Sequence, residues 1–404
     1  MGKRLLALLV ICTLLAGCGA EPDSPSEPAD PAATEQPNIV ATLAVCGDTM
    51  SHMPQTRDAY DEAAQGYNYK PMIRFAKPWV SAADYAVVNL ETTFAGGPDY
   101  SGFPAFNSPD ALGAALADAG FDLVSTANNH CLDRGYDGLA RTLDVLDGVG
   151  LAHVGTYRSA EERNDNDRGV YLADVGGIRM AFLSYTYGTN GIPVSKSHSG
   201  TVNILHTDYL DDAQTLSTSL LWRDFKAAKA LSPDLIAVMV HWGTEYQTTQ
   251  NDHQEEIADY LFSLGADIIL GGHPHVLQPM ETRELQNEDG TTRTGFVCWS
   301  LGNFISAQND EYTDTTVVLQ LELTKNPNTG ISQVTNVQYV PMYMLDREQQ
   351  VNGERYILLD AHRAIRDYEA GKTDLVTTST YKKLQKCVED CHAILGKQGD
   401  SLSR

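Results

Sequence analysis

Five apolar runs in this chain each lead into a residue type that binds metal ions. The clearest run is Ala266–Leu270, which has the length and composition of a buried strand and precedes Gly271-Gly272-His273-Pro274-His275. Two imidazoles one residue apart suit Zn, Mn or Fe, and the paired glycines allow the backbone to approach a bound ion closely. Open α/β sheets bind ligands outside the carboxyl ends of their strands. The feature therefore predicts a metal site at a sheet edge.

The other four runs repeat this pattern in order along the chain. They are Ile39–Val45, Ala83–Val88, Phe121–Ser125 and Pro233–Val238, and they lead into Asp48, Glu91, Asn129 with His130, and His241. Each of these residues alone has an ordinary interpretation: an acid in a loop, an asparagine in a turn, or a histidine satisfied within the core. Because all of them follow successive strands, we expect a site for more than one ion at one edge of a sheet.

Strands and helices alternate over residues 38–345, which indicates an α/β domain. The expected helices are Asp110–Ala119, Tyr136–Val149, Ser217–Leu231 and Asp252–Leu264. Four β-rich runs suggest a second sheet, partly antiparallel and packed face to face on the first: Arg179–Tyr185, Gly295–Ser300, Thr315–Leu323 and Gln333–Val340. Residues 346–404 are expected to form a helical C-terminal extension, with helices at Leu359–Ala370 and Ser379–Leu395.

The N-terminus has the pattern of an export signal. Lys3 and Arg4 precede the apolar run Leu5–Leu15, which is too short for a permanent membrane span. The following Leu15-Ala16-Gly17-Cys18 resembles the bacterial lipobox, which implies cleavage after residue 17 and acylation of Cys18; the alternative is an ordinary signal peptide with an incidental cysteine. Residues 18–37 are rich in Pro, Ala, Ser and acids, and are expected to be a disordered tether. Together these features predict a lipid-anchored protein at the extracytoplasmic face of the membrane.

Charge and cysteine content narrow the classes of partner. The formal net charge is −24, and removal of residues 1–17 takes away two further basic residues. Such an acidic surface argues against nucleic acid as a partner and repels polyanions everywhere except at a metal site. Five cysteines remain after Cys12 and Cys18 are set aside, and they have no framework spacing, so disulfides are not expected to hold the domain together.

Six motifs in one order over residues 38–345 resemble the bacterial CapA family of poly-γ-glutamate capsule-synthesis proteins. They are Gly47-Asp48, Asn89-Leu90-Glu91, Ala127-Asn128-Asn129-His130, His241-Trp242-Gly243, Gly272-His273-Pro274-His275 and Ser300-Leu301-Gly302-Asn303-Phe304. That family is similar to the calcineurin-like metallophosphoesterases. The resemblance implies a four-layer αββα sandwich that holds two divalent metal ions, with Mn, Zn or Fe as the expected metals.

The resemblance also implies roles for individual residues. The metal ligands would be Asp48, Glu91 as a bridge, Asn129, His241, His273 and His275. His130 would lie beside the ions and either polarise the substrate or protonate the leaving group, with Asp133 orienting its ring. The expected substrate or cleft residues are Asn128, Trp242, Glu245 and Asn303, of which Asn303 would buttress the cleft without binding metal. Trp242 would be either packing or cleft wall.

Three departures from the metallophosphoesterase pattern point to one metal position being a ligand short. Met50 stands where the first motif of the esterases has histidine, and Glu91 replaces the usual aspartate. Cys131 follows His130 where an acid is usual. His52 could replace the missing imidazole, or it could be a solvated loop histidine.

Two functions are compatible with this sequence. The first is a lipid-anchored, metal-dependent hydrolase of a phosphoester or of an amide-linked capsule polymer. The second is a non-catalytic capsule-assembly factor that holds poly-γ-glutamate through its metal cleft. Partners expected in either case are the membrane, through the lipid anchor, poly-γ-glutamate, and capsule synthetase or export subunits, and no nucleic acid.

Overall fold

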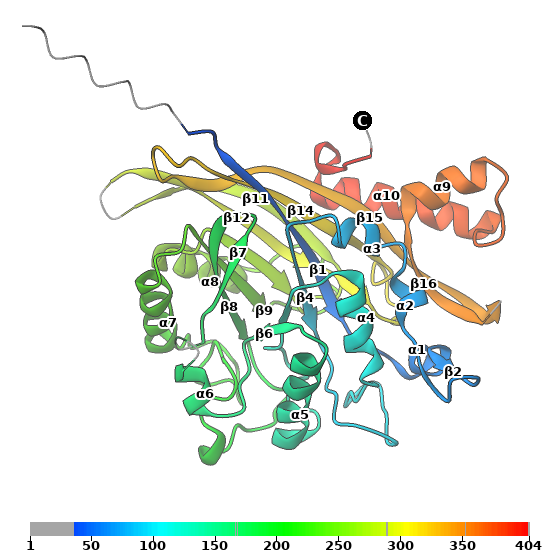
Figure 1. Cartoon of the computed structure of the whole chain (residues 1–404), viewed down its shortest axis with the longest axis horizontal. Helices are drawn as coiled ribbons and strands as arrows, with labels where there is room; N and C mark the ends of the chain where they lie inside the picture. Colours follow the sequence, from blue (N-terminus) through cyan, green and yellow to red (C-terminus); the bar gives the residue numbers. More distant parts are fainter. Residues whose placement is uncertain (1–35, 166, 168, 288–289, 352, 403–404) are drawn as a thin grey trace, which may run out of the picture. The chain divides into compact units, whose positions relative to one another are not determined.

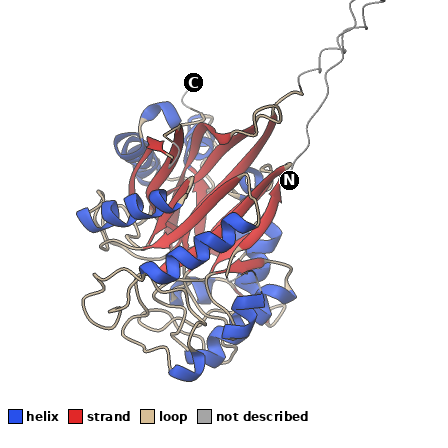
Figure 2. Cartoon of the chain, turned by 90° about the vertical axis from the view of Figure 1, so that its left-hand side faces the viewer, coloured by secondary structure: helices blue, strands red, loops and turns tan. Residues whose placement is uncertain are grey.

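The computed structural model describes residues 36–165, 167, 169–287, 290–351 and 353–402. Two β-sheets lie face to face and helices cover their outer faces, so the layers follow the order αββα (Figures 1 and 2). This is the four-layer sandwich expected from the sequence. The signal segment, most of the tether and Cys18 lie outside the described residues.

The first sheet combines parallel strands with an antiparallel edge. Its order is β16-β15-β14-β1-β4-β5-β6, and a short strand, β13, pairs with the end of β1. The strands β1, β4, β5 and β6 are parallel, whereas β14, β15 and β16 run antiparallel to their neighbours. Their bounds are β1 Ile39–Thr49, β4 Tyr85–Leu90, β5 Leu123–Ser125, β6 Ala152–Val154, β13 Asn303–Ile305, β14 Thr315–Lys325, β15 Ser332–Val351 and β16 Glu354–Asp360.

The second sheet also combines parallel strands with antiparallel edge strands. Its order is β11-β12-β10-β9-β8-β7, with a parallel centre, β12 to β8, and one antiparallel strand at each edge. The bounds are β7 Tyr171–Val175, β8 Ile178–Thr186, β9 Leu235–His241, β10 Ile268–Gly272, β11 Leu277–Gln286 and β12 Thr292–Leu301. A separate two-stranded ribbon consists of β2 Tyr60–Asp61 and β3 Gly66–Tyr67.

Alternation along the strands explains why both sheets are buried on both faces. In β1, Leu43 and Val45 belong to the apolar cluster between the sheets, whereas Ala44 and Cys46 belong to the cluster beneath the outer helices. Successive side chains of a strand point to opposite faces, and a sheet covered on both faces needs apolar residues at every position. This requirement accounts for the continuous apolar runs seen in the sequence.

Helices fill the two outer layers and one flank. The outer face of the first sheet is covered mainly by α4 and α5, with α2 and α3 beside them, and the outer face of the second sheet by α7 and α8. The helix α8 begins at an Asn251–Gln254 capping box and ends at Gly265, whose φ of +107° suits glycine. The helix bounds are α1 Met53–Asp58, α2 Lys70–Ile73, α3 Lys77–Val80, α4 Ala111–Ala119, α5 Gly135–Gly148, α6 Ala160–Asp165, α7 Thr218–Ala230, α8 Asp252–Leu264, α9 Ala361–Glu369 and α10 Thr378–Leu395, with short 3₁₀ turns at η1 Lys196–His198 and η2 Lys397–Gly399.

The structure corrects the expected division of strands between the sheets. Runs Arg179–Tyr185 and Gly295–Ser300 do lie in the second sheet, but β9 and β10 lie there as well, and β14 and β15 join the first sheet beside β1. Apolar periodicity identifies a strand but not its neighbours, because the strands of both sheets are buried on both faces.

The C-terminal helices are present, but they begin later than residue 346. Residues up to 360 continue β15 and form β16, so the expected extension starts with sheet. The helices α9 and α10 then pack on β14 and β15 and against β11, which extends the layer of the second sheet (Figure 1). Among the described residues no helix is long and apolar enough to cross a membrane, and the five described cysteines are free and buried.

Candidate metal centre

The carboxyl ends of parallel strands from both sheets meet at one end of the sandwich. The first sheet supplies Asp48 at the end of β1, Glu91 directly after β4, and Asn129 and His130 after β5; the second sheet supplies His241 at the end of β9, and His273 and His275 after β10. The candidate ligands therefore come from two sheets rather than from one edge of a single sheet, as the sequence had led us to expect. Strand ends from two face-to-face sheets can surround an ion more completely than one edge can.

Two fully buried carboxylates form the centre of the site. Glu91 Oε1 lies 3.4 Å from His241 Nε2, and Glu91 Oε2 lies 4.0 Å from His275 Nδ1. Asp48 Oδ2 lies 3.5 Å from the same nitrogen of His275, and Asp48 Oδ1 lies 4.0 Å from His241 Nδ1. The imidazoles of His241 and His275 therefore each face both carboxylates.

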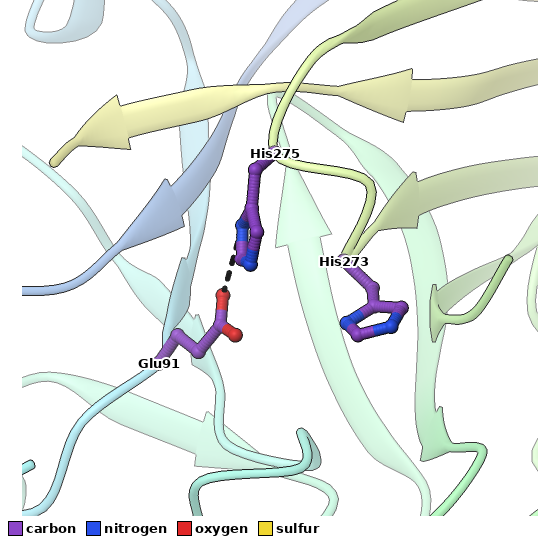
Figure 3. Close-up of side chains that lie close together, drawn as sticks. All are labelled: Glu91, His273 and His275. Carbon is purple, nitrogen blue, oxygen red and sulfur yellow. Dashed lines mark ion pairs between the residues drawn. The ribbon is translucent and has the colours of Figure 1, made fainter. Parts of the chain in front are cut away.

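Two groups of donor atoms share Glu91. One group consists of Glu91, His273 and His275, and the other of Asp48, Glu91 and His241; within each group the donor atoms lie within 4.8 Å of one another. Figure 3 shows Glu91 and His275 facing each other across the dashed ion pair, with His273 beside them. The geometry places Glu91 between two potential ion positions.

The hydrogen bonding of the cluster fits a bound cation. Both carboxylate oxygens of Glu91, and the Nδ1 atoms of His273 and His275, are buried and have no hydrogen-bond partner among the described residues. Buried polar atoms are nearly always paired, because an unpaired buried carboxylate costs several kcal/mol. Carboxylate and imidazole are donors that Zn, Mn and Fe accept. The residues present therefore fit a divalent metal.

The surroundings shift the pKa values of His273 and His275 in opposite directions. Burial alone would lower the pKa of His275, but the carboxylates of Glu91 and Asp48 outweigh it and raise that pKa to about 9. Burial and the nearby imidazoles of His241 and His275 hold the pKa of His273 well below its usual range. Burial would raise the pKa of Asp48, yet the neighbouring imidazoles bring it below its ordinary value. One protonated imidazole thus partly balances the two acids in the metal-free protein.

The backbone of the Gly-Gly-His-Pro-His segment is strained where it turns toward the acids. His273 has φ +96° and His275 has φ +61°, in the left-handed region that costs non-glycine residues energy. The backbone N–H of His273 donates to Asp48 Oδ2 at 2.9 Å, which fixes the turn against the acid. A Cβ on Gly272 would lie 2.6 Å from Asp48 Oδ1, so this approach requires glycine.

His130 stands at the side of this cluster and is held by Asp133. Its Nδ1 lies 2.7 Å from Asp133 Oδ2, which also accepts the backbone N–H of Phe106 at 2.6 Å. Its Nε2 lies 4.0 Å from Glu91 Oε1, so this nitrogen faces the centre. Burial would lower the pKa of His130, but Asp133 and Glu91 raise it above the ordinary value.

Two residues that the sequence reasoning missed contact the cluster, one at Asn129 and one at His273. Asn129 Oδ1 lies 2.9 Å from His241 Nε2, and Asn129 Nδ2 donates to Asn190 Oδ1 at 3.1 Å. The ring of Tyr187 packs against His273, with 4.6 Å between the ring centroids. Both missed residues belong to the connection after β8, where no periodic signal marks them.

Asn89 is a third missed residue. Its Nδ2 donates to Asp48 Oδ1 at 2.8 Å and lies 3.4 Å from His241 Nδ1. Asn89 lies two residues before Glu91, and residues two apart lie on the same side of a strand. That spacing is the signal that could have identified it.

The expected cleft residues behave differently from one another. Glu245 is 45% exposed, with Oε1 3.9 Å from His275 Nε2, and so lies at the mouth of the site. Asn128 is fully buried and acts in the turn: its Nδ2 donates to the carbonyl of Leu90 at 2.6 Å, and its Oδ1 accepts the N–H of His130 at 3.1 Å. Asn303, paired in register with Asp48, donates to Gln308 and Thr313, which suits a buttress.

Trp242 does not line a cleft, which corrects the cleft assignment and leaves the alternative that it packs in the core. It is 1% exposed, stacks on Trp299 and donates to the carbonyl of that residue at 3.0 Å, in the cluster between the second sheet and α7 and α8. Trp242 directly follows His241, and consecutive side chains of an extended segment point to opposite faces.

The structure shows the surroundings of the residues that depart from the esterase pattern and of His52, the possible replacement ligand. Met50 is buried, and Cys131, also buried, has a pKa raised to about 12 by burial, which makes its thiol unreactive. His52 is half-buried and makes specific contacts: its Nδ1 accepts the N–H of Ala307 at 3.3 Å, and its ring meets Phe106 edge-on. It belongs to neither donor group of the described residues.

Comparison with known proteins identifies a bacterial protein family and two relatives from Bacillus that are similar to this chain. Residues 42–308 match the model of the family described as bacterial capsule synthesis protein PGA_cap. The capsule biosynthesis protein CapA of Bacillus anthracis is 28% identical over 72% of this chain and 65% of its own length. The PGA biosynthesis protein CapA of Bacillus subtilis is 28% identical over 66% of this chain and 64% of its own length. The chain thus spans under two thirds of the length of these relatives.

A solved structure of a candidate 5′-nucleotidase from Staphylococcus aureus, in complex with alpha-ketoglutarate, covers 78% of this chain and 56% of its own. The TM-score is 0.43 and the identity 15%, a likeness too low to carry an argument. The family model, in contrast, spans most of the sandwich and every residue of the candidate metal centre. The chain belongs to the bacterial capsule synthesis protein family, PGA_cap.

Proposed function

We propose that this protein is a metal-dependent hydrolase of poly-γ-glutamate capsule synthesis or export. The observation that carries the proposal is the set of buried, unpartnered donor atoms around Glu91: its two carboxylate oxygens and the Nδ1 atoms of His273 and His275. A stable core seldom leaves so many buried polar atoms unpaired in one place unless a ligand completes them.

The proposed centre takes two divalent ions with Glu91 shared between them. His273 and His275 would hold one ion with Glu91; Asp48 and His241 would hold the other with Glu91, joined by Asn129, whose Oδ1 lies 2.9 Å from His241 Nε2. When bound, divalent ions supply positive charge that stabilises the negative charge developing on oxygen during hydrolysis. Zn, Mn and Fe all suit this donor set.

The His130–Asp133 pair would move the proton. Asp133 holds Nδ1, which leaves Nε2 directed at the centre, and Asp133 and Glu91 raise the pKa of His130 above its ordinary value, which favours the protonated ring. A protonated imidazole in this position can donate to a leaving oxygen or nitrogen. Asp133 acts through His130 and is a positioning residue.

The family and the relatives support the biological setting. The relatives from Bacillus are named for capsule or PGA biosynthesis, and we extend that role to this chain, with poly-γ-glutamate as substrate or cargo and synthetase or export subunits as partners. The lipobox-like segment supports acylation at Cys18 and attachment to the extracytoplasmic face of the membrane. The acidic charge would confine a polyanionic polymer to the metal cleft.

A second function is favoured by one observation. Met50 occupies the position at which the esterases carry a histidine ligand, so one ion position has fewer donors. A centre that binds metal incompletely could hold a carboxylate-rich polymer without hydrolysing it. The protein would then be a non-catalytic capsule-assembly factor.

One assay separates these functions. Purified protein is loaded with Mn, Zn, Fe or Mg and tested on phosphoesters and on γ-glutamyl peptides, with His273→Ala as the control that lacks a ligand. Turnover by the wild type that is lost in His273→Ala supports the hydrolase. Metal-dependent binding of γ-glutamyl peptide without turnover of any substrate supports the assembly factor.

A further inference from the structure

The connection between β8 and α7 places one asparagine against two residues of the candidate centre. Asn190 Oδ1 accepts a hydrogen bond from Asn129 Nδ2 at 3.1 Å. Its own Nδ2 lies 3.3 Å from Nδ1 and 3.5 Å from Nε2 of His130, against the imidazole ring. Asn190 therefore touches both a candidate ligand and the candidate proton donor through one side chain.

The hydrogen bond that Asn129 donates to Asn190 determines which end of the Asn129 amide faces the candidate centre. An amide offers a carbonyl oxygen that can bind a metal and an NH₂ group that cannot. With Nδ2 bonded to Asn190, Oδ1 points inward, where it lies 2.9 Å from His241 Nε2. The ring of Tyr187, from the same connection, packs against His273, with 4.6 Å between the ring centroids.

The local backbone suits this task. Asn190 has φ +49°, a left-handed conformation that asparagine tolerates better than most residues, and Gly191 follows with φ +74°. Thr189 closes the turn, because its carbonyl accepts the N–H of Ile192 at 2.9 Å. Asn190 is exposed, and the turn places its amide against Asn129 and His130.

We propose that Asn190 is a positioning residue of the metal centre, which fixes the Asn129 amide with its oxygen toward the divalent ion and braces the ring of His130. This inference rests on the proposed metal centre. Partners that orient a metal ligand typically contribute about 10–100-fold to metal affinity.

The test measures metal affinity by competition with a chelator, using Mn²⁺ or Zn²⁺ and the full chain. Asn190→Gly removes the amide and keeps the left-handed backbone, and it should weaken binding by about 10–100-fold. Asn190→Asp keeps an acceptor for Asn129 Nδ2 and should restore affinity close to that of the wild type. Ala213→Gly is the matched control, since Ala213 has the same φ of +49° in the same connection, and it should bind as the wild type does.

A double variant separates orientation from a general loosening of the loop. In Asn129→Asp both ends of the side chain are oxygen, so no wrong orientation exists, and adding Asn190→Gly should cost little further affinity. An equal loss from Asn190→Gly in both backgrounds, or an equal loss in Ala213→Gly, would overturn the proposal.

Failure of this inference is distinguishable from failure of the metal centre. If the wild type binds metal and His273→Ala does not, but Asn190→Gly binds as tightly as the wild type, only the role of Asn190 is wrong. If the wild type binds neither ion, the metal centre and the role of Asn190 are both wrong.

Discussion

Replacing Gly272 with alanine should disturb the candidate centre by direct contact. The added Cβ would lie 2.6 Å from Asp48 Oδ1 and 3.5 Å from His241 Nδ1. Ordinary contact begins at 3.4 Å, so the carboxylate would have to withdraw by about 0.8 Å. Asp48 cannot move so far and keep its hydrogen bonds from Asn89 at 2.8 Å and from the N–H of His273 at 2.9 Å.

The expected cost has two parts. Overpacking a tightly packed position typically costs about 1–3 kcal/mol of the free energy of unfolding. Displacing a ligand should lower metal affinity by at least ~10-fold, the smaller effect seen when only a ligand's supporting partner is lost. Urea denaturation of metal-free protein measures the first, and chelator competition measures the second.

Gly148→Ala provides the matched control. Gly148 is the last residue of α5, and apart from its chain neighbours and the backbone of its own helix no described atom lies within 4 Å of the position its Cβ would take. This variant should keep wild-type metal affinity and keep or gain stability, by up to about 1 kcal/mol. Metal affinity in Gly272→Ala equal to that of the wild type would show that Asp48 and Gly272 do not border a metal position, and would refute this reasoning.

Three further predictions follow from the site and the N-terminus. His130→Ala should lower turnover by about 10²–10⁴-fold on any substrate found while metal content stays near wild type, whereas His273→Ala should lose both; equal turnover in His130→Ala would reject the proton-transfer role. Metal affinity should fall as the pH falls below 9, by up to about tenfold per unit for one proton, because the ion must displace the proton that the raised pKa keeps on His275; titrations at several pH values check this, and a flat profile would contradict it. Cys18→Ser should leave precursor or soluble protein when cells are fractionated, and a variant still held in the membrane as the wild type is would place the anchor elsewhere.

The sequence predicts where strands occur better than it predicts which strands pair with one another. The apolar runs predicted β1, β4, β5, β9 and β10 and the residues at their ends, because burial on both faces leaves a continuous apolar signal. It could not assign β9 and β10 to the second sheet, since strand pairing depends on contacts between distant segments. Residues 346–360 were missed as strand because the expected extension was judged by its helices.

In the site, too, the sequence indicates residues that follow a regular strand but not residues placed by tertiary contacts. Asp48, Glu91, His241, His273 and His275 were found because each stands at a strand end. For Trp242, alternation with His241 directs the side chain to the other face, which favours packing over a cleft wall.

Asn190 and Tyr187 could not have been found in this way. They lie in an irregular connection that returns to the centre after β8, and no periodic pattern records that path. Their contacts with Asn129 and His273 depend on tertiary packing alone.

Anomalous X-ray diffraction from crystals grown with Mn²⁺ or Zn²⁺ would show whether Glu91 lies between divalent metal positions. We expect an anomalous peak within bonding distance of Glu91, with His273 or His241 as a further ligand. At full occupancy we expect two such peaks, about 3.5–4 Å apart, on either side of the Glu91 carboxylate. Crystals grown at saturating metal that show no peak beside Glu91 would mean that Glu91 does not bind a metal ion.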